Sequence, residues 1–260
     1  MIMLHPRIIP TLLIHNKGLV KTVKFKDAKY VGDPINAVKI FNEKEVDEII
    51  VVDIDASTKG CEPDFKLIEN LAFECRMPLC YGGGIKTVDQ AQKIFSLGVE
   101  KIALSSAAID NLSIISAIAE RVGNQSVVVV IDIRKRKFGN RYDIFKHNGT
   151  INTKINPIEF AIEMEKQGAG ELVVNSIDND GIMQGYDLNI IQKIREVISI
   201  PLTAMGGAGS LDDIGELIKQ HGIIGAAAGS LFVFKGKYRA VLINYPSPAQ
   251  KDELIASHFH

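Results

Sequence analysis

The segment PLCYGGGIKTVDQ, residues 78–90, aligns with PLTAMGGAGSLDD, residues 201–213. Position 201 minus position 78 gives a spacing of 123, and the same spacing relates Glu48 to Glu171. Chance similarity between two buried units is the simpler explanation, but matches at one spacing in separate segments favour an internal repeat. The sequence therefore predicts a chain that was built by duplication of a half-length unit.

Short β-branched runs alternate with longer amphipathic stretches along the chain. The runs that predict strands are Arg7 to Ile14, Glu48 to Ile54, Pro78 to Tyr81, Lys101 to Leu104, Ser126 to Ile133, Glu171 to Asn175, Pro201 to Met205 and Ile223 to Ala228. The stretches that predict helices are Pro34 to Lys44, Asp64 to Cys75, Thr87 to Leu97, Ser113 to Val122, Pro157 to Gln167, Asp187 to Val197 and Leu211 to Lys219.

This alternation of strands and helices requires a parallel sheet, and the apolar strand Val127 to Ile131 indicates burial on both faces. We predict an α/β fold, a single (β/α)8 TIM barrel domain over residues 1–260, with half-barrels of approximately 1–124 and 125–245. An open doubly wound sheet has the same alternation but would not account for the repeat.

Composition limits the classes of ligand and location. The chain is 46% hydrophobic and 23% charged with a net charge of -1, which gives no basic field for nucleic acid, so small solutes are the expected ligands. The odd number of cysteines, with none paired at metal-ligand spacing, predicts no disulfide framework and no metal, and no cofactor is expected. Without a signal-peptide layout or a membrane span, we expect a soluble cytoplasmic protein. The terminal Ser257-His258-Phe259-His260 is assigned no role.

Two glycine clusters follow predicted strands and lead into helices. Gly82-Gly83-Gly84 follows the third strand and Gly206-Gly207-Ala208-Gly209 the seventh. Backbone N–H groups at a helix N-terminus bind anions, and glycine lets the backbone approach them. One cluster alone would favour a tight turn, whereas two at symmetric positions favour a substrate with phosphate at both ends. The predicted phosphate-binding residues are Gly84, Ser105, Ser106, Asp180, Gly181, Gly207, Gly229 and Ser230. For Asp180 the alternative is a turn cap.

Asp132 ends the fifth strand within the apolar run VVVVIDIR. Strands of a barrel point their C-terminal ends at the catalytic mouth, so this carboxylate is a candidate general acid or base. A structural salt bridge with Arg134 or Lys135 is the alternative. Residues 135–153 after this strand form a polar insertion with the pattern of a small hairpin, either a mobile lid or a structural element.

Several of these motifs are similar to the cyclase subunit of imidazole glycerol phosphate synthase (HisF) from Arg7 to about Phe234. The resemblance is carried by Gly82-Gly83-Gly84, Val130-Ile131-Asp132, Gly206-Gly207-Ala208-Gly209 and the long motif Ser176 to Asp187, SIDNDGIMQGYD. It implies a HisH-like glutaminase bound at the N-terminal face of the barrel and ammonia passing through the core. It also implies a charged gate at that entrance, matched here by Arg7, Glu48, Lys101 and Glu171, and a catalytic role for Asp132 and Lys21.

The chain departs from that family pattern around the mouth. The family's second acid/base aspartate ends the first strand, where this sequence has Leu13, and Asn175, Met205 and Ser105 replace a threonine, a serine and an asparagine. Such barrels occur as second copies in gene clusters for surface polysaccharide. The resemblance therefore implies a diverged paralogue that supplies ammonia for sugar amidation, with a sugar amidotransferase as a further partner.

Three other functions remain open. An authentic cyclase-lyase of histidine biosynthesis would act on a small phosphorylated substrate, but Leu13 argues against it. A non-catalytic conduit that activates its glutaminase needs only the gate. The isomerase of the same pathway ranks last, since it also calls for a first-strand aspartate.

Overall fold

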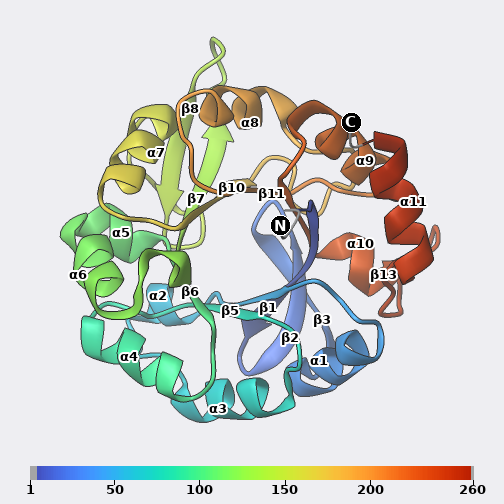
Figure 1. Ribbon diagram of the computed structural model, residues 1–260, viewed down its shortest axis with the longest axis horizontal. Coiled ribbons are helices and arrows are strands. Elements are labelled where there is room, and N and C mark those ends of the chain that lie inside the picture. Colours follow the sequence, from blue (N-terminus) through green and yellow to red (C-terminus); the bar gives the residue numbers. More distant parts are fainter. Residues whose placement is uncertain (1–4, 259–260) are drawn as a thin grey trace.

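Eight parallel strands close into a barrel surrounded by helices (Figure 1). The computed structural model describes residues 5–258, so Phe259 and His260 of the terminal histidine stretch lie outside the described residues. The barrel strands are β1 (Arg7–His15), β4 (Ile49–Asp53), β5 (Leu79–Gly82), β6 (Lys101–Leu104), β7 (Val127–Lys135), β10 (Glu171–Ser176), β11 (Leu202–Met205) and β12 (Gly225–Ala228). The barrel closes where β1 pairs with β12, with Arg7 opposite Gly225. The predicted TIM barrel is confirmed.

The outer layer consists of helices that follow the strands. They are α1 (Pro34–Glu43), α3 (Phe65–Glu74), α4 (Val88–Ser96), α6 (Ser113–Val122), α7 (Pro157–Lys166), α8 (Leu188–Arg195), α9 (Leu211–His221) and α11 (Pro248–His258). Shorter helices are α2 (Ala56–Lys59), α5 (Ser106–Asp110), α10 (Ser230–Val233) and the 3-10 turn η1 (Asn124–Ser126). Among residues 5–258, no helix combines the length and apolar character needed to cross a membrane.

Side chains alternate along each strand between two separate clusters. One set, which includes Ile8 and Leu12 of β1, packs outward against the helices. The other set, which includes Ile9 of β1 and Cys80 of β5, fills the barrel interior with small and medium apolar groups. This period of two is what strands buried on both faces require.

The strand register relates the two halves of the barrel. Leu13 of β1 is paired with Val52 of β4, and Asp132 of β7 is paired with Asn175 of β10. Val52 and Asn175 are themselves 123 positions apart, the spacing of the sequence repeat. Leu13 and Asp132 therefore occupy corresponding places in the two halves, which supports the proposal that the halves arose by duplication.

Three hairpins extend beyond the barrel. The first comprises β2 (Gly18–Val23) and β3 (Lys26–Gly32), and the second comprises β8 (Tyr142–Lys146) and β9 (Ile151–Asn152) within the 135–153 insertion. The β8–β9 hairpin is the one that the sequence pattern predicts, and β8 also pairs antiparallel with β7. The third, β13 (Phe234–Lys235) with β14 (Ala240–Val241), follows α10.

Candidate functional site

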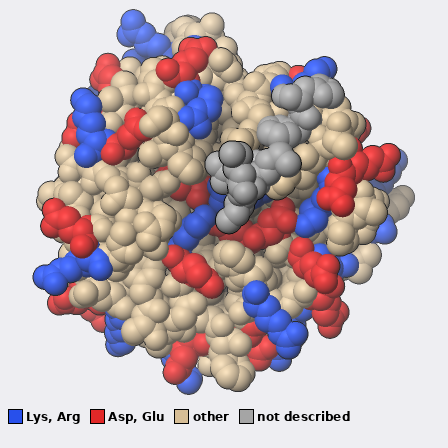
Figure 2. All heavy atoms as spheres, viewed as in Figure 1, with Lys and Arg blue, Asp and Glu red and all other residues tan. Residues whose placement is uncertain are grey.

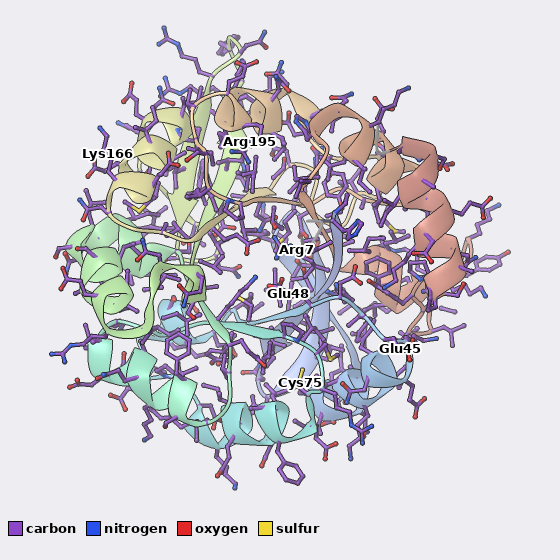
Figure 3. The ribbon with its side chains drawn as sticks, in the orientation of Figure 1. Arg7, Glu45, Glu48, Cys75, Lys166 and Arg195 are labelled. Atoms are coloured by element: carbon purple, nitrogen blue, oxygen red, sulfur yellow. The ribbon has the colours of Figure 1, made fainter. Side chains whose placement is uncertain are left out.

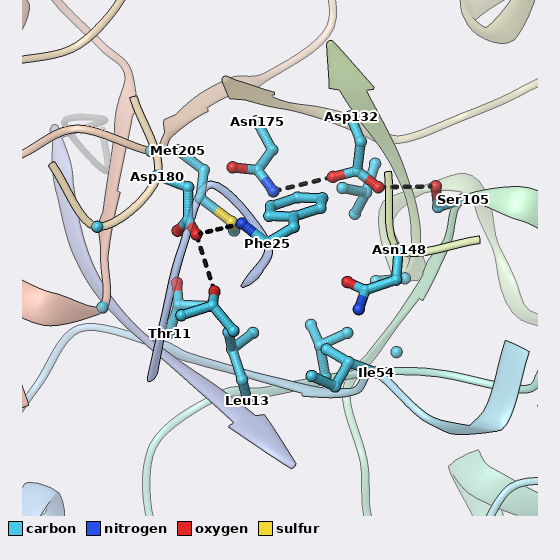
Figure 4. A pocket seen from close by; sticks show the side chains of 18 of the residues that line it. Thr11, Leu13, Phe25, Ile54, Ser105, Asp132, Asn148, Asn175, Asp180 and Met205 are labelled. Atoms are coloured by element: carbon cyan, nitrogen blue, oxygen red, sulfur yellow. Dashed lines mark hydrogen bonds between the residues drawn. The ribbon is translucent and has the colours of Figure 1, made fainter. Parts of the chain in front are cut away.

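A pocket lies at the C-terminal ends of the strands and has a cavity volume of about 130 Å³. Residues from both halves of the barrel and from two of the hairpins line it (Figure 4). Among the predicted site residues, those that line it are Lys21, Ser105, Ser106, Asp132, Asp180, Gly181, Gly207, Gly229 and Ser230. The fold thus brings together residues that are more than 200 positions apart in the sequence.

Asp132 does not end its strand as predicted: β7 continues to Lys135, and Asp132 lies near the end of the part of β7 that pairs with β10. Burial raises the pKa of this carboxyl to about 7, although hydrogen bonds from Asn175 and Ser105 act in the opposite direction. Asn175 donates from Nδ2 to Oδ1 at 2.9 Å, and Ser105 donates from Oγ to Oδ2 at 3.4 Å (Figure 4). A carboxyl with a pKa near neutrality can give or take a proton at physiological pH. Arg134 pairs with Asp178 instead, so the alternative of an Asp132–Arg134 salt bridge is wrong.

The wall of the pocket opposite Asp132 is apolar. Leu13 and Ile54 lie there, and Met205 also lines the pocket (Figure 4). Thr11 is buried in the same pocket, and no hydrogen-bond partner for its Oγ1, or for Oδ1 of Asn175, is present among the described residues. Buried polar atoms without partners are costly to a folded protein. These two oxygens are therefore available to accept hydrogen bonds from a bound molecule.

Lys21 of β2 reaches the barrel interior from the first hairpin. Its Nζ donates to the backbone carbonyl of Thr11, and burial lowers the pKa of the amine to about 8, while Asp180 acts in the raising direction. Asp180 is itself held by Thr22, whose Oγ1 donates to Oδ2 at 2.8 Å, and by the backbone N–H of Phe25. This fixes the β2–β3 hairpin over the mouth.

The predicted phosphate-binding residues divide into two groups in space. Gly181, Gly207, Gly229 and Ser230 follow the neighbouring strands β10, β11 and β12, and so they lie along one side of the pocket. Ser106 lies on the other side, and its Oγ accepts a hydrogen bond from the backbone N–H of His147. Gly84 lines an adjoining groove together with Ser106 rather than the pocket itself, and Ser105 turns its hydroxyl to Asp132.

Glycine is required at two of these positions by close backbone contacts. Gly181 has a φ of 69°, and a Cβ there would lie 2.2 Å from the carbonyl oxygen of Thr22. Gly207 has a φ of 118°, and a Cβ there would lie 2.1 Å from the carbonyl oxygen of Gly185. Both the backbone conformation and the lack of space exclude larger residues.

At the opposite end of the barrel, four side chains form a charged ring: Arg7, Glu48, Lys101 and Glu171. Arg7 bonds both acids, Lys101 bonds both acids at 2.9 Å, and both glutamates are 3% exposed. Burial would raise the pKa of Glu171, but the charges and hydrogen bonds of Arg7 and Lys101 lower it overall. Acidic and basic side chains gather at the centre of this face (Figure 2), and Arg7 and Glu48 lie together inside the ring of helices (Figure 3).

The interior between the charged ring and the mouth is apolar. Cys80, Ala103 and Ala227 are part of its lining, and burial raises the pKa of the Cys80 thiol well above its usual range. Within residues 5–258 no group of three or more histidine, cysteine or acidic side chains is placed to hold a metal ion. All three cysteines are free.

Some pocket residues were not predicted from the sequence. Asp53 ends β4, and burial raises the pKa of its carboxyl despite hydrogen bonds from two backbone N–H groups. The sequence feature that could have identified Asp53 is its position at the end of an apolar strand. Phe25 and Asn148 enter from the first two hairpins (Figure 4), and their positions depend on long-range folding that no local pattern reveals.

Comparison with known proteins agrees with this arrangement. Residues 7–239 match the family described as "Histidine biosynthesis protein". A relative from Vibrio vulnificus (strain YJ016), named "Putative imidazole glycerol phosphate synthase subunit hisF3", is 60% identical over 253 residues, 97% of each chain. The chain belongs to the HisF family.

Two other members of the HisF family show how far the similarity extends. A Pseudomonas aeruginosa (PAO1) protein named "Putative imidazole glycerol phosphate synthase subunit hisF2" is 52% identical over 250 residues, 96% of this chain and 99% of that one. The "Imidazole glycerol phosphate synthase subunit HisF" of Clostridium botulinum (strain 657) is 39% identical over 233 residues, 90% of this chain and 92% of that one. The resemblance inferred from the motifs is thus confirmed.

Proposed function

We propose that this HisF-family barrel is the synthase subunit of a glutaminase–synthase complex and delivers ammonia to an acceptor at its mouth. The charged ring is the proposed contact for a HisH-like glutaminase, and the apolar interior leads from it to Asp132. Neutral ammonia passes an apolar lining more readily than ammonium, because a charge in a low-dielectric interior costs several kcal/mol.

The acceptor is proposed to be other than the imidazole precursor, and the observation that carries this is Leu13. It lies where the repeat and the family pattern both call for an aspartate, across the mouth from Asp132. A leucine cannot transfer a proton, so one side of the site lacks its acid/base group. Asn175, which bonds to Asp132, and Met205 also depart from the family pattern, and both line the same pocket.

We infer that the barrel has diverged toward sugar amidation for surface polysaccharide, in which ammonia replaces the carbonyl oxygen of a sugar N-acetyl group, lost as water, to give an acetamidino group. A phosphorylated or nucleotide-linked sugar suits the two glycine-rich sides of the mouth, and a sugar amidotransferase is the expected third partner. The authentic cyclase-lyase is the second candidate, favoured by the retention of Asp132 and Lys21. A barrel that only activates its glutaminase is the third.

One experiment separates these functions. The purified barrel is combined with the glutaminase and the amidotransferase encoded near it, and amidine formation from glutamine is measured alongside cyclisation of the imidazole precursor with free ammonia. We expect glutamine-dependent amidination and cyclisation at least about 100-fold slower than by an authentic cyclase. Efficient cyclisation by the unmodified chain would restore the histidine-pathway function, and glutaminase activation without either product would favour the conduit.

A further inference from the structure

The hairpin of β13 and β14 places the cationic side chain of Arg239 at the edge of the pocket. Arg239 lies in its turn, half-buried, and Nη2 of its guanidinium donates to the carbonyl oxygen of Gly181 at 3.3 Å and to Oγ of Ser230 at 3.4 Å. Gly181 and Ser230 both line the pocket, on the side that also carries Gly207 and Gly229. The guanidinium is thus at the rim of the place proposed for one phosphate.

The hairpin holds this side chain in a defined position. Leu242 donates its backbone N–H to the carbonyl of Val233 at 2.9 Å, and Asn244 donates from Nδ2 to the carbonyl oxygens of Leu231 and Phe234. The Arg239 guanidinium also stacks on the ring of Phe234, 4.8 Å from its centroid. A cation fixed in this way loses little side-chain entropy when an anion binds.

The charge of Arg239 is not matched by a local ion pair. Among residues 5–258, no carboxylate lies within 4.0 Å of its guanidinium. The positive charge of Arg239 acts to lower the pKa of Asp180, and this carboxylate already accepts hydrogen bonds from Thr22 and Phe25. The amine of Lys21 reaches the same side of the mouth, close to Gly229. This side of the pocket therefore has the two cations Arg239 and Lys21 and one carboxylate that is already hydrogen-bonded, which suits it to bind an anion.

We propose that Arg239 is a substrate-binding residue that grips the phosphoryl group seated beside Gly181 and Ser230. Five N–H donors in a planar fork match phosphate oxygens, and the guanidinium is engaged at this edge only with neutral acceptors that a phosphate can share. The inference deepens the proposed function, since it rests on phosphate binding at the mouth. Through Arg239, the β13–β14 hairpin thus recognises the charge of the substrate.

Site-resolved phosphate binding tests this assignment. Inorganic phosphate is titrated into the full chain at constant ionic strength, and ¹H–¹⁵N NMR signals of Gly181 and Ser230 report one side of the mouth while Gly84 and Ser106 report the other. Arg239→Gln should weaken binding at Gly181 and Ser230 by about tenfold or more, because charge-assisted hydrogen bonds are lost. Binding at Gly84 and Ser106 should change by less than about twofold, since these residues do not contact Arg239.

Two variants provide the controls. Lys237→Gln removes an exposed charge from the same turn and should bind phosphate nearly as the parent does, whereas Arg239→Lys should fall between parent and Arg239→Gln. If Arg239→Gln binds phosphate at Gly181 as tightly as the parent, Arg239 only holds the hairpin in place. The role proposed for Arg239 then fails, while phosphate binding at the mouth stands. If the parent shows no saturable phosphate shifts, the phosphate-binding part of the proposed function fails with it.

Discussion

Asn175 donates a hydrogen bond of 2.9 Å from Nδ2 to Oδ1 of Asp132, and this bond stabilises the ionised carboxylate. Removing it by Asn175→Leu should raise the pKa of Asp132 above its value of about 7, because burial then acts with less opposition. A ¹³C NMR titration of the carboxyl measures the shift. Asn148 lines the same pocket, is not hydrogen-bonded to Asp132 and has a φ of 55°, so Asn148→Gly is the control. An unchanged or lower pKa in Asn175→Leu would show that this hydrogen bond does not favour the ionised form.

The same carboxyl makes stability depend on pH. The pKa of Asp132 is about 7 in the folded chain, against an ordinary value of 3.8, so the folded state binds more protons between these values and stability declines as pH rises through them. Asp132→Asn should therefore be more stable than the parent at pH 8, by up to about 4 kcal/mol, with little difference near pH 4. Urea unfolding at both pH values measures this. Asp252→Asn, on the exposed face of α11, should show no such dependence, and equal stability of Asp132→Asn and parent at pH 8 would contradict the burial argument.

Leu13 should limit cyclisation. Loss of one positioned acid or base typically costs 10²- to 10⁴-fold in rate, roughly 3 to 5 kcal/mol of barrier. We expect the unmodified chain to fail to rescue a histidine auxotroph that lacks its own cyclase, and Leu13→Asp to recover part of the rate with ammonia. Leu13→Asn, which is polar but cannot act as a base at neutral pH, separates proton transfer from polarity. Equal gains from both substitutions would show that the aspartate does not act as a base.

The charged ring should control both stability and ammonia delivery. Glu48→Ala removes a buried partner of Arg7 and Lys101 and should cost about 3 kcal/mol, whereas Glu69→Ala, in an exposed pair with Lys66, should cost less than about 1 kcal/mol. Lys101→Ala should leave the rate of glutamine hydrolysis by the bound glutaminase unchanged. The ammonia should escape to solvent instead of being incorporated into product. Hydrolysis and product formation are measured together, and unchanged coupling in both ring variants would count against a gate.

Anions should bind on both sides of the mouth. Crystals soaked in sulfate or phosphate should show one anion beside Gly181, Gly207 and Ser230 and another beside Gly84 and Ser106, because each side offers backbone and hydroxyl donors. Gly207→Ala introduces a Cβ with no room beside the carbonyl of Gly185 and should lose the first anion while keeping the second. Anions found only elsewhere on the surface would argue against the two-sided mouth.

The barrel strands could be predicted closely because each is a short apolar run with a polar boundary. The run Glu48 to Ile54 became β4, Ile49–Asp53, and Ser113 to Val122 became α6 without change. In contrast, the stretch after Val233 carries no clear period, so its hairpin and α11 were not predicted. Their positions depend on contacts with Phe232 and with α9, which are far from local in the sequence.

Site residues could be predicted where a polar or small residue lies near the C-terminal end of a strand. Ser230 stands just after the end of β12, and Asp132 lies near the end of the part of β7 that pairs with β10, so topology places both at the mouth. Gly84 illustrates the limit, since it follows the correct strand but faces the adjoining groove. Phe25, Asn148 and Arg239 reach the mouth from hairpins, and the direction in which a hairpin folds is set by tertiary packing rather than by its own residues.

Arg7 and Leu13 stand six residues apart on the single strand β1, a separation of about 20 Å at the rise of an extended chain. Substitutions that far apart usually act independently on free energy. A lineage could therefore exchange the groups that do chemistry at one end while the surface offered to a companion protein at the other end stayed the same. Grafting the mouth of one paralogue onto the base of another should accordingly produce hybrids that keep their companion and change their product.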